Sequence, residues 1–154
     1  MTYLIRAVVV LLGVVSLLSA AEAKGKIDQA ELKKLQGTWT LVSGEMDGKP
    51  LPDAAVKPSK ITWKKGAIDI VSPHQSKQPI KAQLTELDAS KTPHAMTFKR
   101  PKGPNAGKNL KGVYAFDRPN TYKVCFDPSG KTRPKELATT PGSGYILHVW
   151  KRAK

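Results

Sequence analysis

Short apolar runs that alternate with polar positions recur along most of the chain. Between residues 67 and 71 the order is Ala-Ile-Asp-Ile-Val, and between 80 and 85 it is Ile-Lys-Ala-Gln-Leu-Thr. A period of two predicts strands that bury one face and leave the other in water. Lys64-Lys65-Gly66 separates the first of these strands from Ile61-Thr62-Trp63, and this spacing predicts a β-hairpin.

The same criteria predict further strands and a single helix. The strands, separated by glycine- and proline-rich segments, cover residues 38–43, 96–98, 110–116, 121–126 and 145–150. Asp28 and Glu31 have the spacing of a capping box, and a short apolar stripe runs on to Gly37, so a two-turn helix is predicted before the first strand. About eight strands with hairpin-like spacing predict an all-β fold, an antiparallel up-and-down β-barrel with a short N-terminal helix.

Alternation also predicts which side chains face the interior of this barrel. They are Trp39, Leu41, Ile61, Trp63, Ile68, Ile70, Leu84, Phe98, Tyr114, Phe116, Tyr122, Val124, Leu147 and Val149. A barrel of about eight strands is just wide enough either to be filled by its side chains or to hold one small ligand. The hydrophobic pattern is compatible with both.

The first 23 residues have the composition of a cleaved secretory signal peptide. Arg6 precedes an apolar stretch from Ala7 to Ala21, and Ala21-Glu22-Ala23 has the small-x-small form of a cleavage site. About 15 apolar residues are fewer than the roughly 20 that a membrane-spanning helix needs. We therefore expect cleavage after Ala23, a secreted or periplasmic location, and one domain over residues 24–154 without a transmembrane span; an uncleaved anchor is the alternative.

The net charge and the cysteine content give further information about the mature domain. The chain of 154 residues has a formal net charge of +14, and the leader contributes only Arg6 and Glu22, so the mature domain is equally basic. Cys125 is the only cysteine, which excludes an intrachain disulfide. Because Cys125 alternates with larger apolar residues in its strand, we expect a half-buried packing thiol rather than a reactive one.

The start of the first strand resembles a motif of the lipocalin barrels. Gly37-Thr38-Trp39 matches the pattern G-x-W. In lipocalins this tryptophan closes one end of the barrel, and a basic residue from the last strand packs over it. The resemblance implies that Gly37 and Trp39 form a structural plug with Arg152 or Lys151.

Several blocks in order resemble the lipocalin-like domain family of uncharacterised secreted proteins common in planctomycetes. The blocks are Leu35-Gln36-Gly37-Thr38-Trp39, residues 47–52, Gly112-Val113-Tyr114, residues 123–126, Arg133-Pro134 and residues 141–144. This resemblance implies the barrel fold and no established ligand, activity or catalytic residue. His148, Trp150 and the basic loop from Lys99 to Lys111 depart from the family pattern.

Motifs for enzyme chemistry are weak. Residues 103–108 resemble a phosphate-binding loop, but the glycine spacing is one residue short and Asn109 replaces the hydroxyl residue that would hold Mg²⁺. His74, His94 and His148 lack metal-ligand spacing, and we expect the first two in solvated loops and His148 in the packing. The chain has no G-x-S-x-G elbow. An enzyme is therefore the least favoured class, and no cofactor or metal is expected.

Clustered basic residues are the remaining functional signal. No acid interrupts the series Lys99, Arg100, Lys102, Lys108 and Lys111. Loops at one end of a barrel would bring such cations into one rim, which would attract anionic polymers by counterion release. Few aromatic residues accompany them, so nucleic acid is a poorly supported partner. A solvated surface without a partner is the simpler interpretation.

Two functions follow from these patterns. The first is an exported, monomeric binding module for a small apolar or amphipathic ligand, with Trp63, Phe98, Tyr114 and Tyr122 as candidate lining residues. The second is a cell-envelope protein whose basic rim holds an anionic polymer. A cavity on the order of several hundred cubic ångströms, open at one end, would favour the first function. An interior filled with side chains would count against it.

Overall fold

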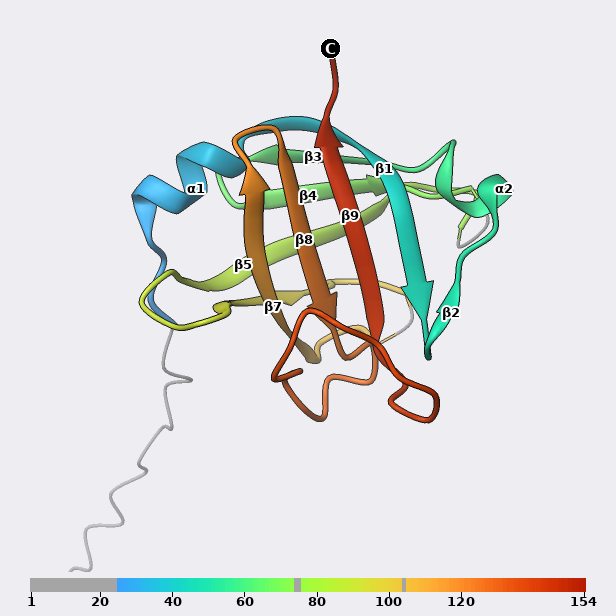
Figure 1. Ribbon diagram of the computed structural model, residues 1–154. Coiled ribbons are helices and arrows are strands. Elements are labelled where there is room, and N and C mark those ends of the chain that lie inside the picture. Colours follow the sequence, from blue (N-terminus) through green and yellow to red (C-terminus); the bar gives the residue numbers. More distant parts are fainter. Residues whose placement is uncertain (1–24, 74–75, 104) are drawn as a thin grey trace, which may run out of the picture.

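Eight antiparallel strands form a closed barrel in the computed structural model (Figure 1), in the order β1-β3-β4-β5-β6-β7-β8-β9 with β9 pairing back to β1. The model describes residues 25–73, 76–103 and 105–154, so the predicted leader (residues 1–23) and His74 lie outside the described part. The elements are α1 (Gln29–Leu35), β1 (Gly37–Met46), β2 (Lys49–Pro50), α2 (Asp53–Val56), β3 (Lys60–Lys64), β4 (Ala67–Val71), β5 (Ile80–Asp88), β6 (His94–Lys99), β7 (Asn109–Arg118), β8 (Thr121–Phe126) and β9 (Ile146–Arg152). The predicted all-β barrel with a short N-terminal helix is confirmed.

Helix α1 lies at one end of the barrel and begins at the predicted cap. The Asp28 carboxylate accepts hydrogen bonds from the backbone N–H groups of Ala30 and Glu31, at 3.0 and 3.2 Å. Glu31 does not complete a capping box; it is buried and accepts a hydrogen bond of 3.1 Å from the hydroxyl of Tyr114. The helix is thereby fixed to the barrel through a side chain of β7.

Trp39 plugs the barrel beneath α1. Its ring is fully buried, and its indole N–H donates to the carbonyl of Leu35 at 2.8 Å. The guanidinium carbon of Arg152 lies 4.2 Å from the centre of the Trp39 ring, and Arg152 also donates to the carbonyl of Gln36 at 2.7 Å. Gly37 has φ 101°, a conformation that favours glycine, and lies beside that guanidinium. The structure therefore has the stacking expected for Arg152, whereas Lys151 is exposed.

Strand β9 faces the opposite way from the prediction. We expected Leu147 and Val149 inside, but β9 pairs with β8 so that Trp150 lies opposite Tyr122 and His148 opposite Val124. Residues directly opposite share a face, so the inward residues of β8 place His148 and Trp150 in the interior. Leu147 packs on the outer face with Cys125, and Val149 is only partly buried.

The long segment between β8 and β9, residues 127–145, is packed against the outside of the barrel. Arg133 donates to the carbonyl oxygens of Met96 at 2.9 Å and Gly112 at 2.6 Å, and to the Glu86 carboxylate at 2.5 Å. Cys125 is fully buried beneath this segment rather than half-buried. The segment thus clamps β5, β6 and β7 from outside.

The region after the first strand is more regular than predicted. Strand β1 continues to Met46, and Asp47 and Gly48, with φ of 53° and 78°, form a two-residue turn into β2. A Cβ at Gly44 would lie 2.7 Å from the end of the Leu51 side chain, so a larger residue there would displace Leu51. β2 and α2 therefore fold over the end of the barrel opposite α1.

Replacing Trp39 with alanine should remove the plug and leave a cavity. Large-to-small core changes of this kind lower the free energy of unfolding by about 3–5 kcal/mol. Urea unfolding followed by circular dichroism would measure the loss, with Val42→Ala as the control, because Val42 is 48% exposed. A Trp39→Ala change within about 1 kcal/mol of that control would contradict the plug.

The Cys125 thiol should resist alkylation in the folded protein. Burial raises its pKa to about 11, so little thiolate forms near neutrality, and access is blocked by the packed segment. Iodoacetamide at about pH 8 should label the protein only after urea unfolding, as measured by mass spectrometry. Labelling of the folded protein at the rate of a free thiol would show that the packed segment opens.

Candidate ligand-binding site at the open end

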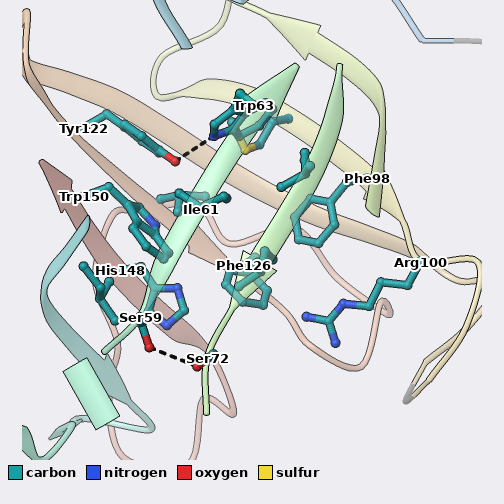
Figure 2. Close-up of a pocket in the computed structure, with 15 residues that line it drawn as sticks. Ser59, Ile61, Trp63, Ser72, Phe98, Arg100, Tyr122, Phe126, His148 and Trp150 are labelled. Atoms are coloured by element: carbon teal, nitrogen blue, oxygen red, sulfur yellow. Dashed lines mark hydrogen bonds between the residues drawn. The ribbon is translucent and has the colours of Figure 1, made fainter. Parts of the chain in front are cut away.

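A narrow apolar cavity of about 50 Å³ lies inside the barrel (Figure 2). Its walls are mainly aromatic and aliphatic, and include Ile61, Trp63, Ile68, Phe98, Tyr122, Val124 and Trp150. Small-molecule sites usually measure roughly 300–1,000 Å³. The interior is therefore mostly filled by its own side chains, and the space that remains fits only a small chemical group. This result counts against ligand binding inside the barrel, where Trp63, Phe98 and Tyr122 were predicted to line the site.

A larger hollow of about 810 Å³ lies at the open end of the barrel. Its apolar lining comes from strand ends and loops, including Met46, Leu51, Ile80 and Ile146. Arg100, Phe126 and His148 line both spaces, so the hollow, which we call the mouth, adjoins the inner cavity. Its volume lies within the range of small-molecule sites.

The predicted aromatic lining residues lie in two different places. Trp63, Phe98 and Tyr122 line the inner cavity, and the Trp63 indole N–H donates to the Tyr122 hydroxyl at 3.1 Å (Figure 2). Burial raises the pKa of Tyr122 well above its usual value, so this hydroxyl is neutral. The structure does not bring Tyr114 into the cavity, because its hydroxyl bonds to Glu31 at the closed end.

Arg100 continues the inward series of β6 one step beyond the strand. Met96 and Phe98 face the interior, and the period of two then places Arg100 on the same side. Figure 2 shows its side chain entering the cavity on the side where Phe126 lies. Its Nε atom is buried and has no hydrogen-bond partner in the described part of the chain. An unsatisfied buried donor costs about 1–3 kcal/mol.

No acidic side chain pairs with Arg100 in the described part of the chain, although Lys81 at the rim is paired with Asp69 at 2.9 Å. No aspartate or glutamate is among the described residues that line the inner cavity or the mouth, whereas Lys81 and Lys102 both line the mouth. Burial lowers the pKa of Arg100 below its usual value, because the cation has lost solvent. The mouth is thus an apolar hollow with a positive floor.

The predicted basic patch is divided by the fold. Arg100 faces inward and Lys102 lines the mouth, while Lys111 lies opposite Thr97 on the outer face of the barrel. Lys99 is also at an outward-facing position of its strand, and Lys108 is exposed in the loop before β7. The sequence did not indicate that Lys81 belongs to this site. Lys81 lies on the outward-facing side of β5, but its position near the end of the strand places it at the rim of the mouth.

His94 is part of a polar cluster at the closed end, not a solvated loop residue as predicted. It begins β6, its ring packs edge-on against Tyr114 with centres 5.1 Å apart, and its Nδ1 lies 3.6 Å from the Glu31 carboxylate. Lys34 donates a hydrogen bond to the same carboxylate. His148 packs between the rings of Phe126 and Trp150, as expected of a packing histidine.

The part of the chain that the structure describes contains neither a metal-binding cluster nor a membrane-spanning helix. Within residues 25–73, 76–103 and 105–154, no group of at least three His, Cys, Asp or Glu side chains is arranged to hold a metal ion. None of the helices in those ranges combines the length and apolarity needed to cross a membrane.

Replacing Arg100 with methionine should stabilise the protein. The change keeps an unbranched apolar stem and removes the buried, unsatisfied Nε donor of a partly buried side chain, so the free energy of unfolding should rise by about 1–3 kcal/mol. Lys102→Met is the matched control, since Lys102 is exposed and its replacement should change stability by less than about 0.5 kcal/mol. A loss of stability in Arg100→Met would mean that Arg100 supports the fold.

Comparisons of the chain with protein-family models, with curated proteins and with solved structures each give no match. The functional argument therefore rests on the mouth, on the cavity beneath it and on the residues that they share.

Proposed function

We propose that this protein is an exported binding module that takes one small apolar or amphipathic molecule at the open end of its barrel. The observation that carries the proposal is the mouth of about 810 Å³, which is lined largely by apolar side chains and adjoins the inner cavity. Such a hollow, apolar with a few convergent polar groups, is typical of sites for small molecules.

The relative volumes favour the mouth over the interior as the place of binding. The inner cavity of about 50 Å³ admits a terminal group of a ligand at most. Met46, Leu51, Ile80 and Ile146 offer apolar surface around the mouth, and each methylene buried there would contribute about 0.8 kcal/mol. Most of the ligand would therefore lie against these residues.

The closed barrel supports binding by holding the mouth in shape. Part of the lining comes from the ends of β1, β5, β8 and β9, which are all hydrogen-bonded members of one ring of strands, and the rest comes from loops that include Leu51 and residues 100–103. A preformed site loses little conformational entropy when a ligand enters. The predicted signal peptide and the resemblance to secreted lipocalin-like proteins support export.

Binding of an anionic polymer is the weaker candidate. Such binding needs many cations on one surface. Side chains alternate between the two faces of β6 and β7, so Arg100 lies inside the barrel while Lys99 and Lys111 lie outside. A polymer site would show steep dependence of affinity on salt. Binding of a neutral molecule in the mouth would be almost independent of salt.

A neutral apolar dye tests the proposed function. The fluorescence of N-phenyl-1-naphthylamine should rise on binding with one-to-one stoichiometry, at both low and high salt. Ile80→Trp would fill the mouth and should weaken binding about tenfold or more. Val71→Trp is the matched control, because Val71 lies on the neighbouring strand with its side chain 43% exposed.

Two results would overturn this function. One is the absence of dye binding to the folded wild-type protein. The other is equal weakening by Ile80→Trp and Val71→Trp, which would place the dye elsewhere on the surface.

A further inference from the structure

We propose that the mouth selects an amphipathic anion, with the anionic head at Arg100 on the floor and the apolar part directed toward solvent. This inference rests on the proposed binding function and adds the chemical class and the orientation of the ligand. It draws on the position of Arg100, the charge of the lining and the difference between the two volumes.

The position of Arg100 is that of a recognition group rather than a structural one. Structural arginines in this protein have partners: Arg133 donates to Glu86 and to two backbone carbonyls, and Arg152 donates to the carbonyl of Gln36. Arg100 has a buried Nε without a partner in the described residues, at the junction of the mouth and the inner cavity. Because Arg100 lines both spaces, its guanidinium lies where a ligand that enters through the mouth would meet it.

The charge of the lining selects an anion. Arg100, Lys81 and Lys102 line the mouth, and no acidic side chain lines it in the described part of the chain. Because Lys81 is already paired with Asp69, Arg100 and Lys102 are the cations that would select an anion. A cation in an apolar hollow is stabilised strongly by an anion brought next to it, because water screens the pair poorly there. A guanidinium offers a planar fork of donors that fits two oxygens of a carboxylate or a phosphate.

The volumes set the orientation. Below Arg100 the cavity measures about 50 Å³, too small for an alkyl chain or a ring system. Above it the mouth measures about 810 Å³ and carries the apolar side chains of Met46, Leu51 and Ile146. The apolar part of the ligand fits only above the guanidinium, so the head enters first and the far end of the tail stays near solvent.

Calorimetric titration with chain-matched ligands tests the selectivity. Decanoate should bind, and decanol and decyltrimethylammonium should bind about tenfold or more weakly, because they lack the anion. Acetate and inorganic phosphate report on a free anion without a tail and should bind much more weakly than decanoate. From hexanoate to decanoate, affinity should rise by about fourfold per methylene.

Substitutions assign the effect to Arg100. Arg100→Gln should lower the affinity for decanoate by about tenfold to a hundredfold while leaving decanol unchanged. Lys111→Gln is the matched control, since it removes one cation of the same predicted patch from the outer face. Circular dichroism would verify that both variants are folded.

A tail-labelled ligand tests the orientation. Undecanoate with a dansylamino group at its far end should bind with an affinity close to that of undecanoate, because the label would remain at the rim. A tail-first arrangement would exclude the label, so a large loss of affinity would overturn the orientation.

The outcomes separate this inference from the proposed function. Equal binding of decanoate and decanol, unchanged in Arg100→Gln, would overturn the anion selectivity while supporting a site for apolar molecules. Acetate binding as tightly as decanoate would reduce the site to a plain anion site and overturn the amphipathic ligand. Failure of every ligand and of the neutral dye would overturn the proposed function itself.

Discussion

Pairing between the first and the last strand is the constraint on which the rest of this structure depends. The chain has a single cysteine, so closure relies on the β1–β9 hydrogen bonds and the core that they enclose. That pairing places Arg152 opposite Trp39 and Ile146 opposite Met46, so one strand pair reaches both ends of the barrel. It fixes the plug at one end and part of the mouth at the other.

The two ends differ in how their polar groups are satisfied. At the closed end, the buried Glu31 carboxylate has Tyr114 and Lys34 as partners, and the Trp39 indole has the Leu35 carbonyl. At the open end, Arg100 lacks such partners among the described residues, and the lining carries no acid. Stability is thus concentrated where the barrel closes, and an uncompensated charge is retained where it opens, as is common at binding sites.

The sequence allowed the strands to be predicted well, because each buries one face and therefore alternates. The prediction was wrong for β9, where both faces carry apolar residues. Leu147 and Val149 are more apolar than His148, so they were expected inside. Pairing with β8, rather than local hydrophobicity, decides which residues of β9 face the interior. Arg100 could have been placed inside by counting in twos from Phe98, but its basic neighbours suggested a surface patch. Cavity volumes depend on how side chains interlock, which no pattern along the chain encodes.

Strand β6 carries two arginine environments on its opposite faces. On the outer face, Arg133 reaches the Thr97 hydroxyl and Glu86; on the inner face, Arg100 follows Phe98 into the mouth. Arg133 comes from the segment between β8 and β9, whereas Arg100 points inward because it lies two residues after Phe98. A deletion of one residue between Phe98 and Arg100 would turn the guanidinium to the outside while the barrel stayed closed. The polarity of the mouth is therefore a property that a single change in length can invert, so barrels of this architecture could diverge in ligand preference without diverging in fold.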